Sequence, residues 1–296
     1  MAAKVLSSIT LLLLMASGML ATSALADHGR VSASSTLHHQ LYRSKNLRDT
    51  GAGAAATVVL IHGWSCDSSY WDAQLAALDR YDVLTLDLAG HGRSPRGEHP
   101  GTMAAFGQDV ASLLTALPTD QPLILVGHSM GGPVAIETAL LLGDRVRGVI
   151  GVDTFSTLTA PPTPPAEVTR RLQAFERDFA STTAAFVSQS FFRTDADPVL
   201  KSRIVASMAA GDPVIGMAAI RGLNDWQGLD RAQQLQRPIV AINADQAPID
   251  VAAIRSRVPQ FSATIVSGLG HFLMMEDPAR FNPLLIDTIE ALLPTD

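Results

Sequence analysis

The chain has 296 residues, of which 47% are hydrophobic, and its 22 basic and 28 acidic residues give a net charge of −6. This length accommodates one large α/β domain with an insertion. The acidic balance and the lack of any basic block exclude nucleic acids and anionic membrane surfaces as expected partners. Cys66 is the only cysteine, so the chain cannot form an internal disulfide, and no feature of the composition indicates an oligomeric state.

Residues 1–26 have the composition of a targeting segment. Lys4 is the only charged residue before Asp27, an apolar run covers 9–20, and the stretch ends in Ala24-Leu25-Ala26. This pattern is typical of a secretory signal peptide cut after Ala26, whereas a retained membrane anchor would need a longer run. An exported chain without disulfides fits a bacterial periplasm or the medium, and no later segment predicts a stable membrane span.

Short apolar runs alternate with helical patterns along most of the remaining chain. Unbroken apolar runs indicate strands that are buried on both faces, and therefore a mostly parallel sheet. The expected strands cover 57–61, 82–86, 122–127, 147–152, 238–242 and 262–266, after an irregular hairpin over 37–47. The expected helices between the strands cover 68–79, 103–117, 131–143 and 279–292.

The alternation breaks between residues 154 and 237. A proline-rich linker at 161–165 precedes segments of helical periodicity, which cover 166–180, 182–192, 196–209 and 213–224. Half of the ten phenylalanines cluster here: Phe175, Phe179, Phe186, Phe191 and Phe192. Either these rings form the core of the inserted segment, or one or two of them, or Trp226, line a substrate pocket.

The strand expected at 122–127 runs into Gly127-His-Ser129-Met-Gly131-Gly132, which is followed by an Ala/Leu-rich helical pattern. A turn this tight between a strand and a helix forces its central residue into strained backbone angles. Small flanking glycines relieve the crowding and leave the serine oxygen clear of the sheet. The context makes Ser129 a candidate nucleophile, which needs a base and an oxyanion site to act.

Three further motifs follow other expected strands. They are His62-Gly63, then Asp87-Leu-Ala-Gly-His-Gly-Arg-Ser94, and near the end Gly268-Leu-Gly-His271. Together with G-x-S-x-G in this order, they resemble the α/β-hydrolase family from Val58 to the C-terminus. The resemblance implies a mostly parallel twisted sheet with helices on both faces. It also implies a core formed by 27–153 and 238–296 and an α-helical cap over 154–237.

The resemblance implies that Ser129 is the nucleophile and His271 the general base. A serine at this position argues against epoxide hydrolases and haloalkane dehalogenases, which attack with a carboxylate. By position, the backbone amides of Trp64 and Met130 form the oxyanion hole, and their side chains are expected to wall the pocket. No histidine pair has metal-ligand spacing with a carboxylate, so we expect neither a metal nor another cofactor.

The remaining histidines and Cys66 are interpreted as structural. His62 is expected to make a structural hydrogen bond and His91 to brace a Gly-rich turn. His128, the variable residue of G-x-S-x-G, is expected to point away from the nucleophile. Cys66 is interpreted as a small, partly buried residue rather than a catalytic thiol.

The acid that orients the base has two candidates. In most family members it follows the strand after the cap, but the matching position here is Ala247, and Asp245 lies two residues early. A family variant carries the acid on the strand after the nucleophile helix, where Asp153 ends the run from Val149. We favour Asp153, with Asp245 as the alternative.

These features predict an exported serine esterase that forms an acyl-enzyme intermediate. The expected substrate is a small carboxylic ester with an apolar acyl group, or a small lactone, rather than a charged molecule. One alternative is a C–C bond hydrolase or other acyl transferase on the same triad. Another is a non-catalytic protein of the same fold that binds a small ligand.

Overall fold

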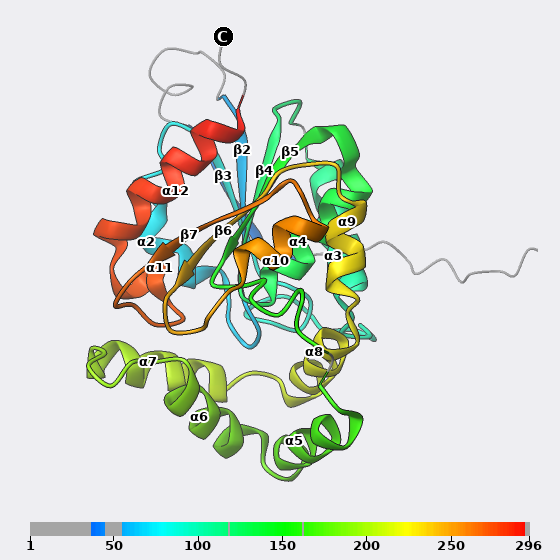
Figure 1. Cartoon of the computed structure of the whole chain (residues 1–296), viewed down its shortest axis with the longest axis vertical. Coiled ribbons are helices and arrows are strands. Elements are labelled where there is room, and N and C mark those ends of the chain that lie inside the picture. Colours follow the sequence, from blue (N-terminus) through cyan, green and yellow to red (C-terminus); the bar gives the residue numbers. More distant parts are fainter. Residues whose placement is uncertain (1–36, 45–54, 118, 162, 294–296) are drawn as a thin grey trace, which may run out of the picture. The chain divides into compact units, whose positions relative to one another are not determined.

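The computed structural model describes residues 37–44, 55–117, 119–161 and 163–293 (Figure 1). The segment interpreted as a signal peptide, 1–26, lies outside these residues. The strands are β1 (His39–Tyr42), β2 (Thr57–Ile61), β3 (Asp82–Leu86), β4 (Leu123–His128), β5 (Val146–Val152), β6 (Ile239–Ala244) and β7 (Phe261–Val266). The helices are α2 (Asp72–Leu75), α3 (Met103–Ala116), α4 (Gly131–Leu142), α5 (Pro165–Arg177), α6 (Phe179–Ser190), α7 (Pro198–Ala209), α8 (Pro213–Asp225), α9 (Gly228–Gln234), α10 (Val251–Arg257), α11 (Leu273–Glu276) and α12 (Pro278–Leu292), with 3₁₀ turns η1 (Ser68–Trp71) and η2 (Gly143–Arg145).

The described strands form one sheet in the order β1-β3-β2-β4-β5-β6-β7. Strand β1 pairs with β3 in the antiparallel sense, and the other neighbours pair in parallel. Helices α3, α4 and α9 lie on one side of the sheet, and α2, α11 and α12 lie on the other (Figure 1). The mostly parallel sheet with helices on both faces confirms the predicted fold class.

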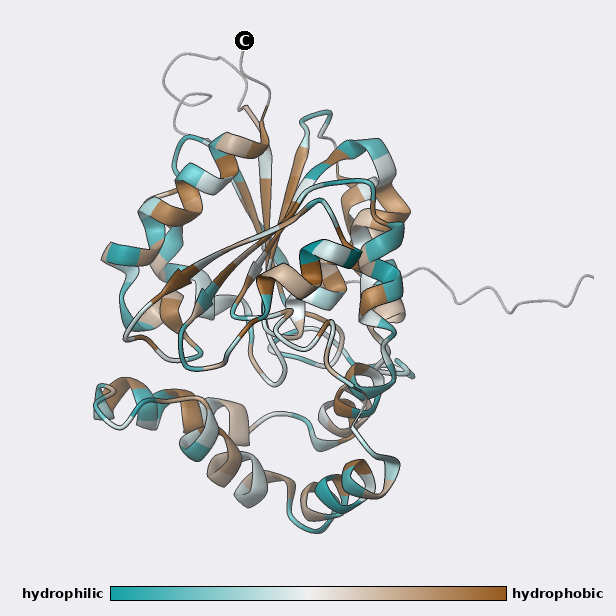
Figure 2. Cartoon of the chain, in the orientation of Figure 1, coloured by the Kyte–Doolittle hydropathy of each residue, from teal (hydrophilic) through white to brown (hydrophobic). Residues whose placement is uncertain are grey.

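The central strands hold the hydrophobic core. Every residue of β2, β3 and β4 is buried, and the strands are among the most hydrophobic parts of the ribbon in Figure 2. Helices cover both faces of these strands, so each side chain along them meets apolar neighbours whichever way it points. For this reason unbroken apolar runs located the six parallel strands to within two residues at either end.

Some sequence-based boundaries were wrong. The helix predicted over 68–79 is a 3₁₀ turn followed by a single α-helical turn, because the N–H of Ala77 bonds to the carbonyl of Gln74 and tightens the chain. Within the described residues β1 pairs with β3 instead of forming a hairpin of its own. Helices α9, α10 and α11 were missed; each has seven residues or fewer.

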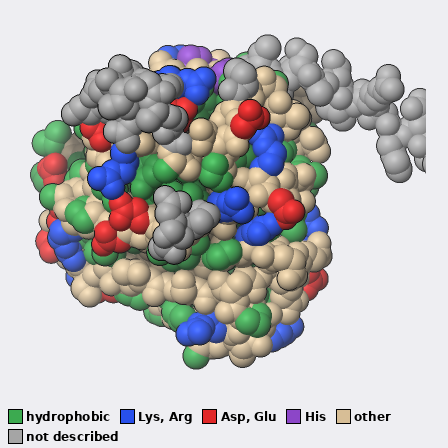
Figure 3. Space-filling model, turned by 90° about the horizontal axis from the view of Figure 1, so that it is seen from above, with side chains coloured by type: hydrophobic (Ala, Val, Ile, Leu, Met, Phe, Trp, Pro, Cys, Tyr) green, Lys and Arg blue, Asp and Glu red, His purple; other side chains and the backbone are tan. Residues whose placement is uncertain are grey.

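Helices α5 to α8 form an inserted segment between β5 and β6. In Figure 1 this inserted segment lies below the sheet, on the side where β5 ends. On the opposite face, seen from above in Figure 3, acidic and basic side chains are interspersed rather than gathered by sign. Among the described residues no single helix is long and apolar enough to cross a membrane. Only α7 and α8 taken together, bent by 97°, meet that criterion by length and composition.

Candidate active site

Ser129 occupies a strained turn between β4 and α4. Its φ angle is 51°, in the left-handed region that favours glycine, and its side chain is half-buried. The strand and helix approach so closely that a Cβ on Gly127 would lie 2.1 Å from the carbonyl oxygen of Gly131. The glycines are therefore required for this geometry, and the N–H of Ser129 is anchored on the carbonyl of Val152 in β5 at 2.9 Å.

His271 and Asp153 are in direct contact. Asp153 directly follows β5 with a φ angle of 46°, and His271 lies in the loop after β7. Nδ1 of His271 is 2.5 Å from Oδ2 of Asp153, and both side chains are largely buried. This contact fixes the orientation of the imidazole, with Nδ1 facing the carboxylate and Nε2 on the other edge of the ring.

The end of β6 holds Asp153 in place. Oδ1 of Asp153 accepts the N–H of Ala244 at 2.8 Å. The buried amide of Asn243 donates to the carbonyl of Thr154 at 2.8 Å and accepts its N–H at 3.2 Å. Asp245 is exposed and faces elsewhere, since its Oδ1 accepts the N–H of Gly268 and contacts Arg193. Of the two candidate acids, the structure brings only Asp153 to His271.

Two residues that the sequence analysis did not assign to the site brace the loop of His271. The carboxylate of Glu276 accepts the N–H groups of Gly270 and Phe272, on either side of His271. Burial raises the pKa of Glu276 above its usual value, which these hydrogen bonds only partly oppose. His128 donates from Nε2 to the carbonyl of His271 at 3.0 Å. Burial lowers the pKa of His128 well below the usual value, so this ring stays neutral beside His271.

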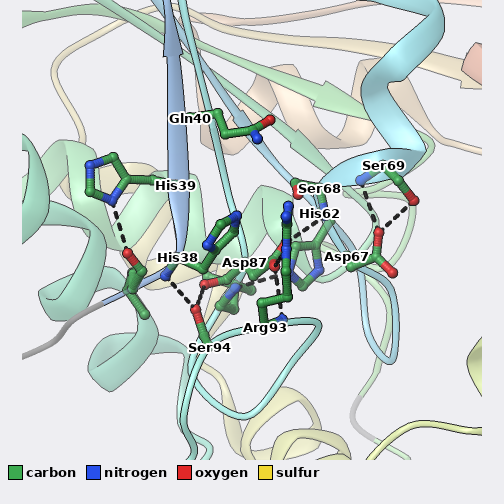
Figure 4. Close-up of polar contacts among 12 residues, drawn as sticks. His38, His39, Gln40, His62, Asp67, Ser68, Ser69, Asp87, Arg93 and Ser94 are labelled. Atoms are coloured by element: carbon green, nitrogen blue, oxygen red, sulfur yellow. Dashed lines mark hydrogen bonds and ion pairs between the residues drawn. The ribbon is translucent and has the colours of Figure 1, made fainter.

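His62 and Asp87 connect the loop after β2 to the loop after β3 (Figure 4). His62 donates from Nδ1 to the carbonyl of Gly63 at 2.8 Å and accepts the N–H of Leu88 on Nε2 at 2.9 Å. Asp87 is buried, but the N–H groups of Arg93 and Ser68 that it accepts hold its pKa below the usual value. His62 is therefore structural, as the sequence analysis expected, and the Gly-rich turn is fixed by a buried carboxylate.

The residues expected to form the oxyanion hole lie beside Ser129. Met130 is the N-cap of α4, where backbone N–H groups lack helical partners. Trp64 follows Gly63, which lies close to the turn between β4 and α4. A Cβ added to Gly63 would lie 3.3 Å from Cβ of Ser129. Met130 is among the residues that line the cavity at Ser129. The side chain of Trp64 packs on Phe175 and Phe179 and donates to the carbonyl of Gly216 in α8 at 2.8 Å.

Cys66 is buried two residues after Trp64. Its Sγ donates to the carbonyl of Trp64, and burial raises the pKa of the thiol. A thiol in this environment remains protonated near neutral pH and is a poor nucleophile.

A cavity of about 670 Å³ opens at Ser129, Asp153 and His271. One group of lining residues is polar: Thr154, Ser156, Thr157, Asn224, Gln227 and Asp230. Another is apolar: Pro133, Phe155, Leu158, Val168, Trp226 and Leu229. No lysine or arginine lies among the described residues that line it, so the cavity offers no cation to pair with an anionic ligand.

The aromatic residues of the inserted segment have different positions relative to this cavity. Trp226 lines it, and its indole N–H donates to the buried carboxylate of Glu137 in α4 at 2.8 Å. The five clustered phenylalanines are not among the described residues that line the cavity. Four of them pack on one another or on Trp64, and Phe192 stacks on Phe272. Phe191 also stacks on the imidazole of His271, a contact that helical periodicity could not reveal.

Within the part of the chain that the structure describes, no group of three His, Cys, Asp or Glu side chains could hold a metal ion. Three ionisable or nucleophilic side chains instead meet at one cavity: a serine at a strained turn, a histidine, and a carboxylate bound to that histidine. Groups of this kind can carry out nucleophilic acyl transfer, in which the histidine moves the serine proton.

Comparisons with known proteins agree with this geometry. Residues 58–284 match the model of the alpha/beta hydrolase family, so the chain belongs to that family. Its relatives include a pimeloyl-[acyl-carrier protein] methyl ester esterase of Neisseria meningitidis serogroup A, which is 29% identical over 263 residues, 85% of this chain and 82% of the relative.

Solved structures resemble it in fold. A thermophilic esterase from Thermogutta terrifontis superposes with a TM-score of 0.73 at 24% identity, over 87% of this chain and 95% of that one. The enol-lactonase from Burkholderia xenovorans LB400 superposes with a TM-score of 0.72 at 22% identity, over 86% and 96%.

Proposed function

We propose that the protein is a serine hydrolase that cleaves an uncharged carboxylic ester or small lactone through an acyl-enzyme intermediate. The observation that carries this proposal is the 2.5 Å contact between His271 and Asp153 at the cavity that Ser129 lines. Relatives named as esterases and a lactonase of the same fold are consistent with this substrate class.

In the first half of the reaction, Oγ of Ser129 attacks the carbonyl carbon while Nε2 of His271 takes the hydroxyl proton. The negative charge that develops on the carbonyl oxygen is stabilised by the backbone N–H groups of Trp64 and Met130. The imidazolium, stabilised by the Asp153 carboxylate, then gives its proton to the departing alcohol oxygen, and the C–O bond breaks.

In the second half, a water molecule enters the site of the alcohol. Nε2 of His271 takes its proton as the water oxygen attacks the acyl carbon, and the proton then passes to Oγ of Ser129 as the acid is released. With a lactone, the alcohol that leaves in the first half stays attached to the acyl group. The same groups therefore serve both substrates.

The lining of the cavity favours neutral substrates. Asp153 and Asp230 contribute carboxylates there, and the described lining residues contribute no cation. A methyl ester whose acyl chain ends in a methyl group should therefore be cleaved faster than one of the same length that ends in a carboxylate.

Chromogenic esters of graded acyl length, together with a small lactone, test the proposal on the purified chain and on Ser129→Ala. The wild type should hydrolyse at least one of these substrates. The variant should keep its circular dichroism spectrum and lose the activity by roughly 10³-fold or more, because no second nucleophile takes over. Near-normal activity in Ser129→Ala, or none in the wild type on any of them, would contradict it.

A further inference from the structure

Phe191, at the end of α6 in the inserted segment, contacts His271 in two ways. Its carbonyl accepts the backbone N–H of His271 at 2.9 Å. Its ring stacks on the imidazole, with 4.2 Å between the ring centroids and 30° between their planes. The two residues are 80 positions apart in the sequence, so the contact exists only because the inserted segment folds against the loop after β7.

The face of a benzene ring carries partial negative charge and attracts a cation within about 6 Å. In the proposed reaction the imidazole of His271 becomes a cation when it takes the proton of Ser129, so an attraction to the cation lowers the barrier. We propose that Phe191 stabilises the imidazolium of His271 through its ring face, and is a further catalytic residue. This inference rests on the proposed function of His271 as the base.

The ring of Phe191 is held in position before any substrate binds. Phe186 and Phe272 pack perpendicular to it, with centroids 5.0 and 5.9 Å away. The hydrogen bond from His271 fixes its backbone, and the ring is half-buried, which limits screening by water. A ring positioned in this way needs little reorganisation when the charge appears on the imidazole.

A graded series of fluorinated phenylalanines at position 191 provides the test. Fluorine atoms withdraw charge from the ring face and change its shape little. We expect kcat for one chromogenic ester to fall stepwise from phenylalanine through the mono-, di- and trifluoro forms, by roughly three- to tenfold in total. Thermal stability should stay the same along the series.

Phe192 supplies the matched control. Its ring stacks on Phe272, at 5.5 Å between centroids, rather than on His271. The same fluorinated series at position 192 should leave kcat unchanged. Equal stepwise losses at both positions would mean that fluorination perturbs packing in general, and would overturn the inference.

Phe191→Leu separates electrostatics from shape, because leucine fills part of the space and offers no ring face. We expect it to lose about as much kcat as the trifluoro form. If kcat fell in Phe191→Leu but stayed constant along the fluorinated series, the ring would contribute only packing. That result would overturn the inference while leaving the proposed function intact. Absence of any Ser129-dependent hydrolysis in the unmodified protein would overturn both.

Discussion

Oδ2 of Asp153 lies 2.5 Å from Nδ1 of His271, although the two residues are 118 positions apart and follow different strands. The end of β6 supports this carboxylate. Its Ala244 N–H bonds to Oδ1 of Asp153, and Asn243 fixes the next residue, Thr154. The Asp153 side chain is therefore held at His271 by the neighbouring strand.

Asp153→Asn should lower kcat by a factor on the order of 10⁴. The amide keeps the size of the side chain but loses the charge that stabilises the imidazolium, and it favours the wrong histidine tautomer. Steady-state kinetics on one chromogenic ester would measure the effect, with circular dichroism as a check on folding.

Asp245→Asn is the matched control for this substitution. Asp245 is exposed and accepts only the N–H of Gly268 and a contact from Arg193, so its loss should cost about tenfold or less. If Asp245→Asn lost most of its kcat and Asp153→Asn kept it, the assignment of the acid would be reversed.

Trp226→Ala should shift the preference of the enzyme toward longer acyl chains. The indole forms part of the cavity wall and is held by the hydrogen bond to Glu137, so its removal enlarges the cavity. The ratio of kcat/KM for a long ester to that for a short one should rise roughly tenfold or more. Phe186→Ala, an exposed ring of the same inserted segment that does not line the cavity, should leave this ratio unchanged.

Asp109→Asn should stabilise the protein in a pH-dependent manner. Burial raises the pKa of Asp109 to about 6. In the unfolded chain an aspartate ionises near about pH 4, so the folded state binds this proton more tightly. The resulting stability is fully present below about pH 4 and is lost as the pH rises through about 6.

Asparagine at position 109 carries no charge at any of these pH values. Asp109→Asn should therefore gain roughly 1–2 kcal/mol in the free energy of unfolding at pH 7.5, and the gain should shrink toward pH 4. Urea denaturation across this range measures it. Asp287→Asn, at an exposed position, should change stability little at any pH. If the gain in stability of Asp109→Asn grew toward low pH, the expected direction of this pH dependence would be wrong.

Local patterns predicted most of the fold, because buried parallel strands require apolar side chains on both faces. They missed α9 and α10, since a helix of seven residues shows barely two turns of periodicity. Export also stays a prediction, because residues 1–36 lie outside the described part of the chain.

The site was predictable where a motif fixes the local backbone, as at Ser129. The role of Asp153 could be proposed from its place at a strand end, but its distance to His271 depends on how two loops fold. Phe191 and Glu276 lay beyond sequence reasoning for the same reason. A phenylalanine on a helix face indicates burial without naming its neighbour, and a glutamate five residues after a histidine is not a known signal.

Intact-mass measurement after treatment with a fluorophosphonate, followed by peptide mapping, tests the central claim most directly. The reagent forms a stable phosphonyl ester only with a serine that is activated by a base and an oxyanion site. We expect one adduct per chain, located on Ser129, and none in Ser129→Ala. A protein that remains unlabelled, or that is labelled at another residue, would contradict the assignment of Ser129 as an activated nucleophile.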